Sequence, residues 1–104
     1  MSRLTRARIN LDALGHNVAQ ARALAPQSAL MAVLKANAYG HGLLPIAHEL
    51  SNQVEGFAVG CREEGLPMRA AGLNHRSVLI GGFFQAEETP VLAAQRFDAG
   101  IHHP

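Results

Sequence analysis

Residues 32 to 42 read AVLKANAYGHG and place one lysine, Lys35, between an apolar run and a turn that is rich in glycine. The run from Ala29 to Leu34 is short and uncharged, which is typical of a strand buried on both faces of a parallel sheet. Burial at the end of such a strand disfavours a charged lysine, so its amine becomes available to bond a carbonyl group or to carry a proton. The simpler interpretation is a surface lysine whose aliphatic stem lies along the strand end.

Three more short apolar runs follow, at residues 56 to 60, 78 to 80 and 97 to 101, with helix-compatible segments between them. This rhythm predicts repeated βα units and a parallel sheet. Enzymes built as a (β/α)8 barrel carry their chemistry at the carboxyl ends of the strands, which is where Lys35 falls. A complete barrel takes about 250 residues, so this chain of 104 residues would supply about half of the strands. The fold class that we expect is α/β, about half of a TIM-type (β/α)8 barrel.

Three segments carry the signals of helices. The first follows Asn10 or Asp12, either of which can cap it, and repeats apolar residues at helical spacing through Leu11, Leu14, Val18 and Ala21. The second covers residues 43 to 50. In the third, Thr89 is expected as the N-cap and Pro90 as the first helical residue, a position where proline is tolerated.

The segment from Cys61 to Ala71 is less suited to a helix, because Gly65 and Pro67 fall inside it. A proline in a helix interior costs about 3 kcal/mol. Glu63 and Glu64 in the first turn contribute at most about 1 kcal/mol each through the helix dipole. We therefore expect a kink or a late start here. Residues 6 to 11 alternate polar and apolar side chains, which predicts a half-buried strand outside the parallel repeat.

The stretch AVLKANAYGHG resembles the pyridoxal phosphate lysine signature of alanine racemases. The resemblance extends over essentially the whole chain, because ARINLDALGHNVAQARAL, GFAVGCREEGLPMRAAGL and VLIGGFF are similar to successive segments of that family's N-terminal domain. It implies that Lys35 binds the cofactor pyridoxal 5'-phosphate covalently and acts as the base for the α proton of D-alanine. It also implies that Tyr39 binds the cofactor phosphate and that the apolar side chain of Ile80 touches the cofactor.

Each of these residues has a structural alternative. Tyr39 alone would be interpreted as a packing residue, and core packing explains Ile80 equally well. Asn37 and His41 are expected to orient the loop through bonds from side chain to backbone. Cys61, with no base or second thiol beside it, is interpreted as structural.

The resemblance further implies an enzyme larger than this chain. Racemisation needs a base on each face of the α carbon, and in this family the second is a tyrosine of the partner subunit. The complete enzyme is implied to be a cytoplasmic homodimer that supplies D-alanine for peptidoglycan, and the strand at residues 6 to 11 is implied to join a C-terminal β domain. We therefore expect residues 1 to 104 to be an N-terminal barrel segment, marginally stable and without racemase activity by itself.

Other functions fit the sequence less well. A barrel-type pyridoxal phosphate homeostasis protein would share the fold and the lysine, but usually differs after the lysine; a catalytically inert fragment is a third possibility. The formal net charge of +1 gives no case for nucleic acid or an anionic membrane. One cysteine excludes an internal disulfide, the histidines lack metal-ligand spacing, and no G-x-G-x-x-G follows a strand.

Overall fold

Strands and helices alternate along the chain, as the spacing of the apolar runs predicts. The computed structural model describes residues 6–81 and 86–100. Its elements are, in order, α1 (Leu11–Leu24), β1 (Met31–Val33), α2 (Lys35–Tyr39), α3 (Leu43–Leu50), β2 (Gly56–Val59), α4 (Arg62–Ala70), β3 (Arg76–Leu79), the 3-10 helix η1 (Ala86–Glu88), α5 (Thr89–Ala94) and β4 (Phe97–Ala99). No helix in these two ranges is long and apolar enough to cross a membrane.

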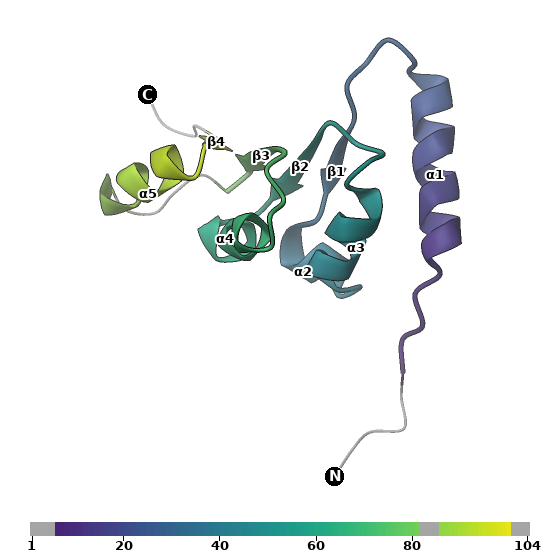
Figure 1. Ribbon diagram of the computed structural model, residues 1–104, viewed down its shortest axis with the longest axis horizontal. Helices are drawn as coiled ribbons and strands as arrows, with labels where there is room; N and C mark the ends of the chain where they lie inside the picture. The colour runs from purple at the N-terminus through teal and green to yellow at the C-terminus, as the bar shows by residue number, and fades with distance from the viewer. Residues whose placement is uncertain (1–5, 82–85, 101–104) are drawn as a thin grey trace.

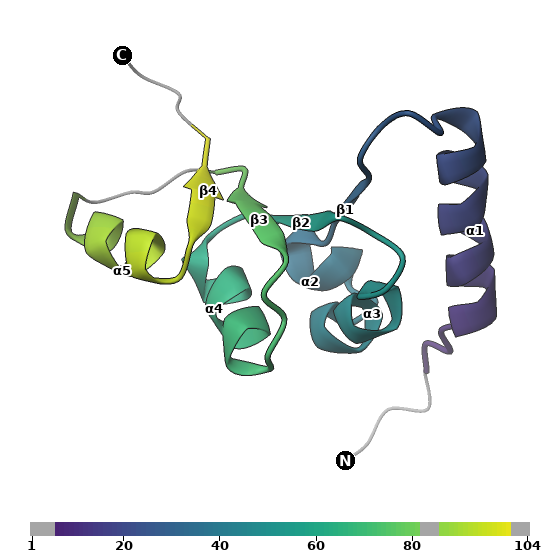
Figure 2. The same ribbon diagram turned by 45° about the horizontal axis from the view of Figure 1, so that its top comes forward.

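The four strands form one parallel sheet in the order β1-β2-β3-β4, each beside its neighbour in the chain. Helices α3 and α4 lie on the same side of this sheet, and α1 stands apart at its β1 end (Figures 1 and 2). Right-handed βα connections between sequential parallel strands build a barrel wall in this way. The expected α/β architecture, a partial (β/α)8 barrel, is confirmed.

Strand β1 is less buried than its apolar sequence predicts. Met31 is 38% exposed and Val33 is 45% exposed, whereas all four residues of β2 are buried. The expectation that the run from Ala29 to Leu34 is buried on both faces is therefore wrong. The physical reason is position, because β1 is an edge strand of the described sheet and β2 has a partner on each side.

The segment before α1 also differs from expectation, because residues 6–10 form no strand. They have no neighbouring strand with which to pair in the described part of the chain. Of the two expected caps, Asn10 is the one used: its side-chain Oδ1 accepts a hydrogen bond from the Ala13 amide at 3.0 Å. This bond satisfies one of the free N–H groups at the start of α1.

Helix α4 begins at once after Cys61 and continues through Pro67. Of the two expected alternatives, a kink or a late start, the late start is therefore wrong. Proline at this position removes one N–H, whose partner would be the carbonyl of the exposed residue Glu63, and water can satisfy that group. Gly65 brings the helix close to the sheet, since a Cβ there would lie 2.7 Å from the Phe97 ring. In α5 the N-cap is Glu88, and Thr89 is the first helical residue.

The core lies between the sheet and helices α3 and α4. Its largest fully buried side chains include Phe57, Val59, Met68 and Leu79. Residues 82 to 84 of VLIGGFF, residue 101 of the fourth apolar run and the histidines at positions 102 and 103 lie outside the described residues.

Candidate functional site

Lys35 lies at the carboxyl edge of the sheet, directly after β1. Leu34 still pairs with the neighbouring strand, since its amide donates to the Ala58 carbonyl at 2.7 Å. Lys35 is the next residue and begins α2. A Cβ atom placed on Gly60, the residue after β2, would lie 3.8 Å from Cβ of Lys35. The lysine therefore stands beside the end of β2.

The side chain of Lys35 is exposed, so the expected burial of this lysine is wrong for the part of the chain that the structure describes. The reason is again that β1 is an edge strand. Lys35 is also the only lysine in the sequence. Within this sequence, chemistry directed at lysine amines therefore reports on this residue.

The segment after Lys35 is a left-handed turn. Residues 36 to 39 all have φ between 54° and 56°, a conformation that costs roughly 1–2 kcal/mol for each residue with a Cβ atom. The turn is closed by hydrogen bonds from the Ala38 amide to the Leu34 carbonyl at 2.8 Å and from the Gly40 amide to the Ala36 carbonyl at 3.0 Å. It ends at Gly40, whose φ of 88° suits glycine.

Asn37 and His41 support this turn through side-chain to backbone bonds, as the sequence predicts. Oδ1 of Asn37 accepts from the Leu43 amide at 2.8 Å, which caps the first turn of α3. Nδ1 of His41 lies 2.9 Å from the Ala38 carbonyl, so it is the nitrogen that carries the proton in this contact. The two side chains therefore tie the left-handed turn to itself and to α3.

Replacing Ala36 with glycine is expected to raise the free energy of unfolding by about 1 kcal/mol, because glycine adopts φ near 54° without the Cβ penalty. The measurement is a urea unfolding curve. The matched control is Ala19→Gly on the exposed surface of α1, where glycine should cost about 1 kcal/mol. An equal decrease in the free energy of unfolding for Ala36→Gly and Ala19→Gly would contradict the left-handed turn.

The other two predicted site residues lie at the same edge. Tyr39 ends the left-handed turn and is 60% exposed. Ile80 follows β3 and is 37% exposed, and its amide donates to the Val59 carbonyl at 2.8 Å. Because the strands are parallel, residues that follow β1 and β3 share one edge of the sheet.

Glu64 belongs to this edge and was missed as a site residue by the sequence analysis, which considered it only as a charge in the first turn of α4. Its Oε1 accepts from the Gly60 amide at 2.7 Å, and its Oε2 accepts from the Asn37 amide at 3.1 Å. The signal that could have found it is its position three residues after Cys61, the N-cap of α4. A glutamate there often reaches back to amides that precede a helix.

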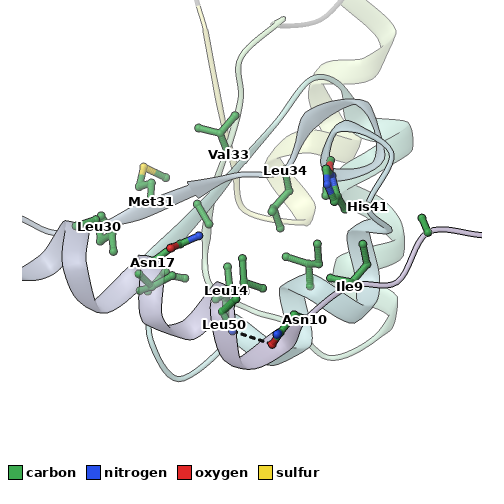
Figure 3. A pocket seen from close by; sticks show the side chains of 18 of the residues that line it. Ile9, Asn10, Leu14, Asn17, Leu30, Met31, Val33, Leu34, His41 and Leu50 are labelled. Atoms are coloured by element: carbon green, nitrogen blue, oxygen red, sulfur yellow. Dashed lines mark hydrogen bonds between the residues drawn. The ribbon is translucent and has the colours of Figure 1, made fainter.

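A cavity of about 720 Å³ lies between α1, β1 and α3. Figure 3 shows that its wall is mostly apolar, with Leu14, Leu34 and Leu50 on it and His41 at one end. Neither Lys35 nor Tyr39 lines it. The chemistry-bearing side chains therefore indicate a site at the sheet edge, outside this cavity.

Neither metal nor thiol chemistry has support at this edge. Across residues 6–81 and 86–100, no three histidine, cysteine, aspartate or glutamate side chains lie close enough to hold a metal ion. Burial raises the pKa of the Cys61 thiol, and a hydrogen bond with Glu63 raises it further. The thiol is therefore not activated as a nucleophile.

The family model described as "Alanine racemase, N-terminal domain" matches residues 9–104. The chain belongs to the alanine racemase family. It is 42% identical to an alanine racemase of Shewanella denitrificans, over 99% of this chain and 29% of that protein. It is 45% identical to the biosynthetic alanine racemase of Escherichia coli K12, over 91% of this chain and 26% of that protein.

Solved alanine racemases share the fold. The alanine racemase of Acinetobacter baumannii superimposes with a TM-score of 0.87 at 38% identity, over 92% of this chain and 28% of that chain. The biosynthetic alanine racemase of Pseudomonas aeruginosa superimposes with a TM-score of 0.86 at 40% identity, over 90% of this chain and 26% of that chain. The chain thus spans less than a third of the length of these alanine racemases.

The residues at the sheet edge fit pyridoxal phosphate, the cofactor implied by the resemblance to alanine racemases. Lys35 and Tyr39 present an exposed amine and an exposed phenol hydroxyl. Gly60 and Gly81 leave the ends of β2 and β3 without side chains, and the Gly81 amide donates to the Gly60 carbonyl at 3.0 Å. The chemistry of this set, one amine and one phenol hydroxyl beside backbone without side chains, suits an aldehyde-bearing cofactor with a phosphate group.

Proposed function

We propose that this chain carries the cofactor lysine of a pyridoxal phosphate-dependent alanine racemase, which interconverts L-alanine and D-alanine. One observation carries the proposal: the sole lysine of a chain in this family lies at the carboxyl edge of a parallel sheet, where barrel enzymes place their chemistry. When bound, pyridoxal phosphate supplies an electron sink that makes the α proton of an amino acid easier to remove.

Three residues of the chain have roles in this proposal. The Lys35 amine holds the cofactor covalently and, when released, takes or returns the proton on one face of the α carbon. The Tyr39 hydroxyl donates a hydrogen bond to a phosphate oxygen. Ile80 offers an apolar surface to the cofactor at the end of β3. The exposure of Lys35 and Tyr39 supports these roles, since both are accessible to a ligand.

The rest of the active site belongs to other parts of the complete protein. Racemisation requires a second base on the opposite face of the α carbon, and we propose that a partner subunit provides it in a homodimer. We also propose that the enzyme works in the cytoplasm and supplies D-alanine for peptidoglycan. The name of the Escherichia coli relative, a biosynthetic alanine racemase, supports this role.

The proposal predicts racemisation with a preference for alanine. The test protein is a chimaera in which this chain replaces the corresponding segment of the Pseudomonas aeruginosa enzyme, with which it shares 40% identity. L-Alanine, L-serine, L-lysine and L-arginine are each incubated with the chimaera and pyridoxal phosphate, and the D-enantiomer is measured by chiral chromatography. Alanine should give the highest kcat/KM.

The unaltered Pseudomonas aeruginosa enzyme is the positive control. A folded chimaera with no racemisation would refute the proposed function. A preference for lysine or arginine would instead make this the segment of a racemase for basic amino acids.

A further inference from the structure

The carboxylate of Glu64 joins two segments that are distant in the sequence and meet at Lys35. Its Oε1 accepts from the amide of Gly60, at the end of β2, at 2.7 Å. Its Oε2 accepts from the amide of Asn37, in the left-handed turn, at 3.1 Å. One side chain on α4 therefore fixes the turn after the lysine to the neighbouring strand.

A carboxylate suits this position because both of its partners are backbone donors. Each of the two oxygens accepts one N–H, and bonds to a charged acceptor are stronger than neutral ones. A glutamine has a single side-chain oxygen, and its NH2 group would face one of the two N–H groups. It can therefore keep at most one of the bonds without conflict.

The backbone is held in place both before and after Lys35: the sheet holds the residue before it, and Glu64 holds the turn after it. Leu34 is held to β2 by the bond from its amide to the Ala58 carbonyl at 2.7 Å. Two residues after Lys35, the amide of Asn37 is held by the carboxylate of Glu64. A Cβ on Gly60 would lie 3.0 Å from Oε1 of Glu64 and 3.8 Å from Cβ of Lys35. The Glu64 carboxylate and Cβ of Lys35 thus both lie next to the backbone of Gly60.

We propose that Glu64 is a positioning residue for Lys35: it locks the left-handed turn against the end of β2 and so aims the lysine amine at the cofactor. The cofactor part of this inference rests on the proposed function. The part that concerns the turn can be measured without any ligand.

Glu63 provides a matched control on the same helix. Its carboxylate is exposed and accepts from Nε of Arg62 at 3.2 Å. Glu63→Gln and Glu64→Gln remove the same charge from adjacent positions, but only the second removes an acceptor from the turn. Glu64→Asp keeps the charge and shortens the reach of the carboxylate by one methylene group.

The first measurement is amide hydrogen exchange in the full chain by NMR. In Glu64→Gln, exchange at the Asn37 and Gly60 amides should accelerate about tenfold, the effect expected when one charge-assisted bond is lost. Exchange at the Phe57 amide in β2 should be equally slow in Glu64→Gln and Glu63→Gln. Equal exchange at Asn37 in Glu63→Gln and Glu64→Gln would overturn the proposal.

The second measurement uses the chimaera with the Pseudomonas aeruginosa enzyme: covalent capture of pyridoxal phosphate by Lys35 is fixed with borohydride and located by peptide mass mapping. Capture at a given cofactor concentration should fall about tenfold in Glu64→Gln and should be unchanged in Glu63→Gln. If the chimaera with Glu64 captures cofactor and the Glu64→Gln chimaera captures it equally well, the positioning role is refuted and the proposed function stands. If a folded chimaera with both Lys35 and Glu64 captures none on Lys35, the proposed function fails, and this inference fails with it.

Glu64→Asp tests the positioning role if Glu64→Gln does not fold. In this variant, the decrease in cofactor capture should be proportional to the increase in exchange at the Asn37 amide. Fast exchange at Asn37 together with undiminished capture would overturn the positioning role.

Discussion

Replacement of Lys35 with alanine is expected to abolish covalent capture of pyridoxal phosphate by the chain, because the sequence contains no other lysine. In the chimaera with the Pseudomonas aeruginosa enzyme, the same substitution should lower kcat by about 10³-fold or more, since both the covalent anchor and a proton-transferring group are lost. Capture is measured by borohydride reduction and mass mapping, and kcat by chiral chromatography.

Lys35→Arg is the control for charge. Arginine keeps the positive charge at the sheet edge but stays protonated and does not form the covalent bond, so it should be as inactive as alanine. Far-ultraviolet circular dichroism should show both variants folded, because the lysine side chain is exposed. A chimaera with Lys35→Ala that still racemises alanine at the original rate would refute the role of this residue.

Replacement of Arg69 with methionine is expected to lower the free energy of unfolding by about 2–4 kcal/mol, because several polar partners lose their donor at once. The guanidinium donates to four backbone carbonyls at 2.8 to 3.2 Å and lies 4.7 Å from the centre of the Phe97 ring. The four acceptors are the carbonyls of Leu73, His75, Gln95 and Arg96. They belong to the segments that lead into β3 and β4, so the loss should be seen in a urea unfolding curve.

Arg76→Met is the matched control for this prediction. Arg76 pairs with Asp98 at 2.7 Å, but its side chain is 77% exposed, and exposed pairs contribute about 1 kcal/mol or less. Arg69→Lys should lose most of the stability as well, because an ammonium lacks the planar set of donors. Equal small losses at positions 69 and 76 would show that the carbonyl contacts contribute little.

Local sequence was sufficient for the architecture. The four apolar runs predicted the four strands, and Asn10, one of two predicted caps, begins α1. Strand and helix patterns are short-range properties, because burial repeats every second residue in a strand and every third or fourth in a helix. The position of Lys35 at a strand end followed from the same pattern. Its roles, and those of Tyr39 and Ile80, remain predictions.

Local sequence did not predict which strand lies at the edge of the sheet and which lies inside it. The runs that became β1 and β2 look alike, yet β1 is exposed at Met31 and Val33 while β2 is wholly buried. An edge strand and a central strand can have the same apolar sequence, since their difference lies in the neighbours that assemble around them.

The conformation of the left-handed turn depends on a tertiary contact as well as on local bonds. Ala36 and Ala38 are of the residue type that most favours a right-handed helix, and nothing in their own chemistry predicts φ near 55°. The sequence determined that a lysine follows a strand and precedes glycines. The turn between them is held partly by the bond from the Leu43 amide to Asn37 within the loop. It is also held by Glu64, 27 residues from Asn37 in the chain, whose bond forms only when α4 packs beside the turn.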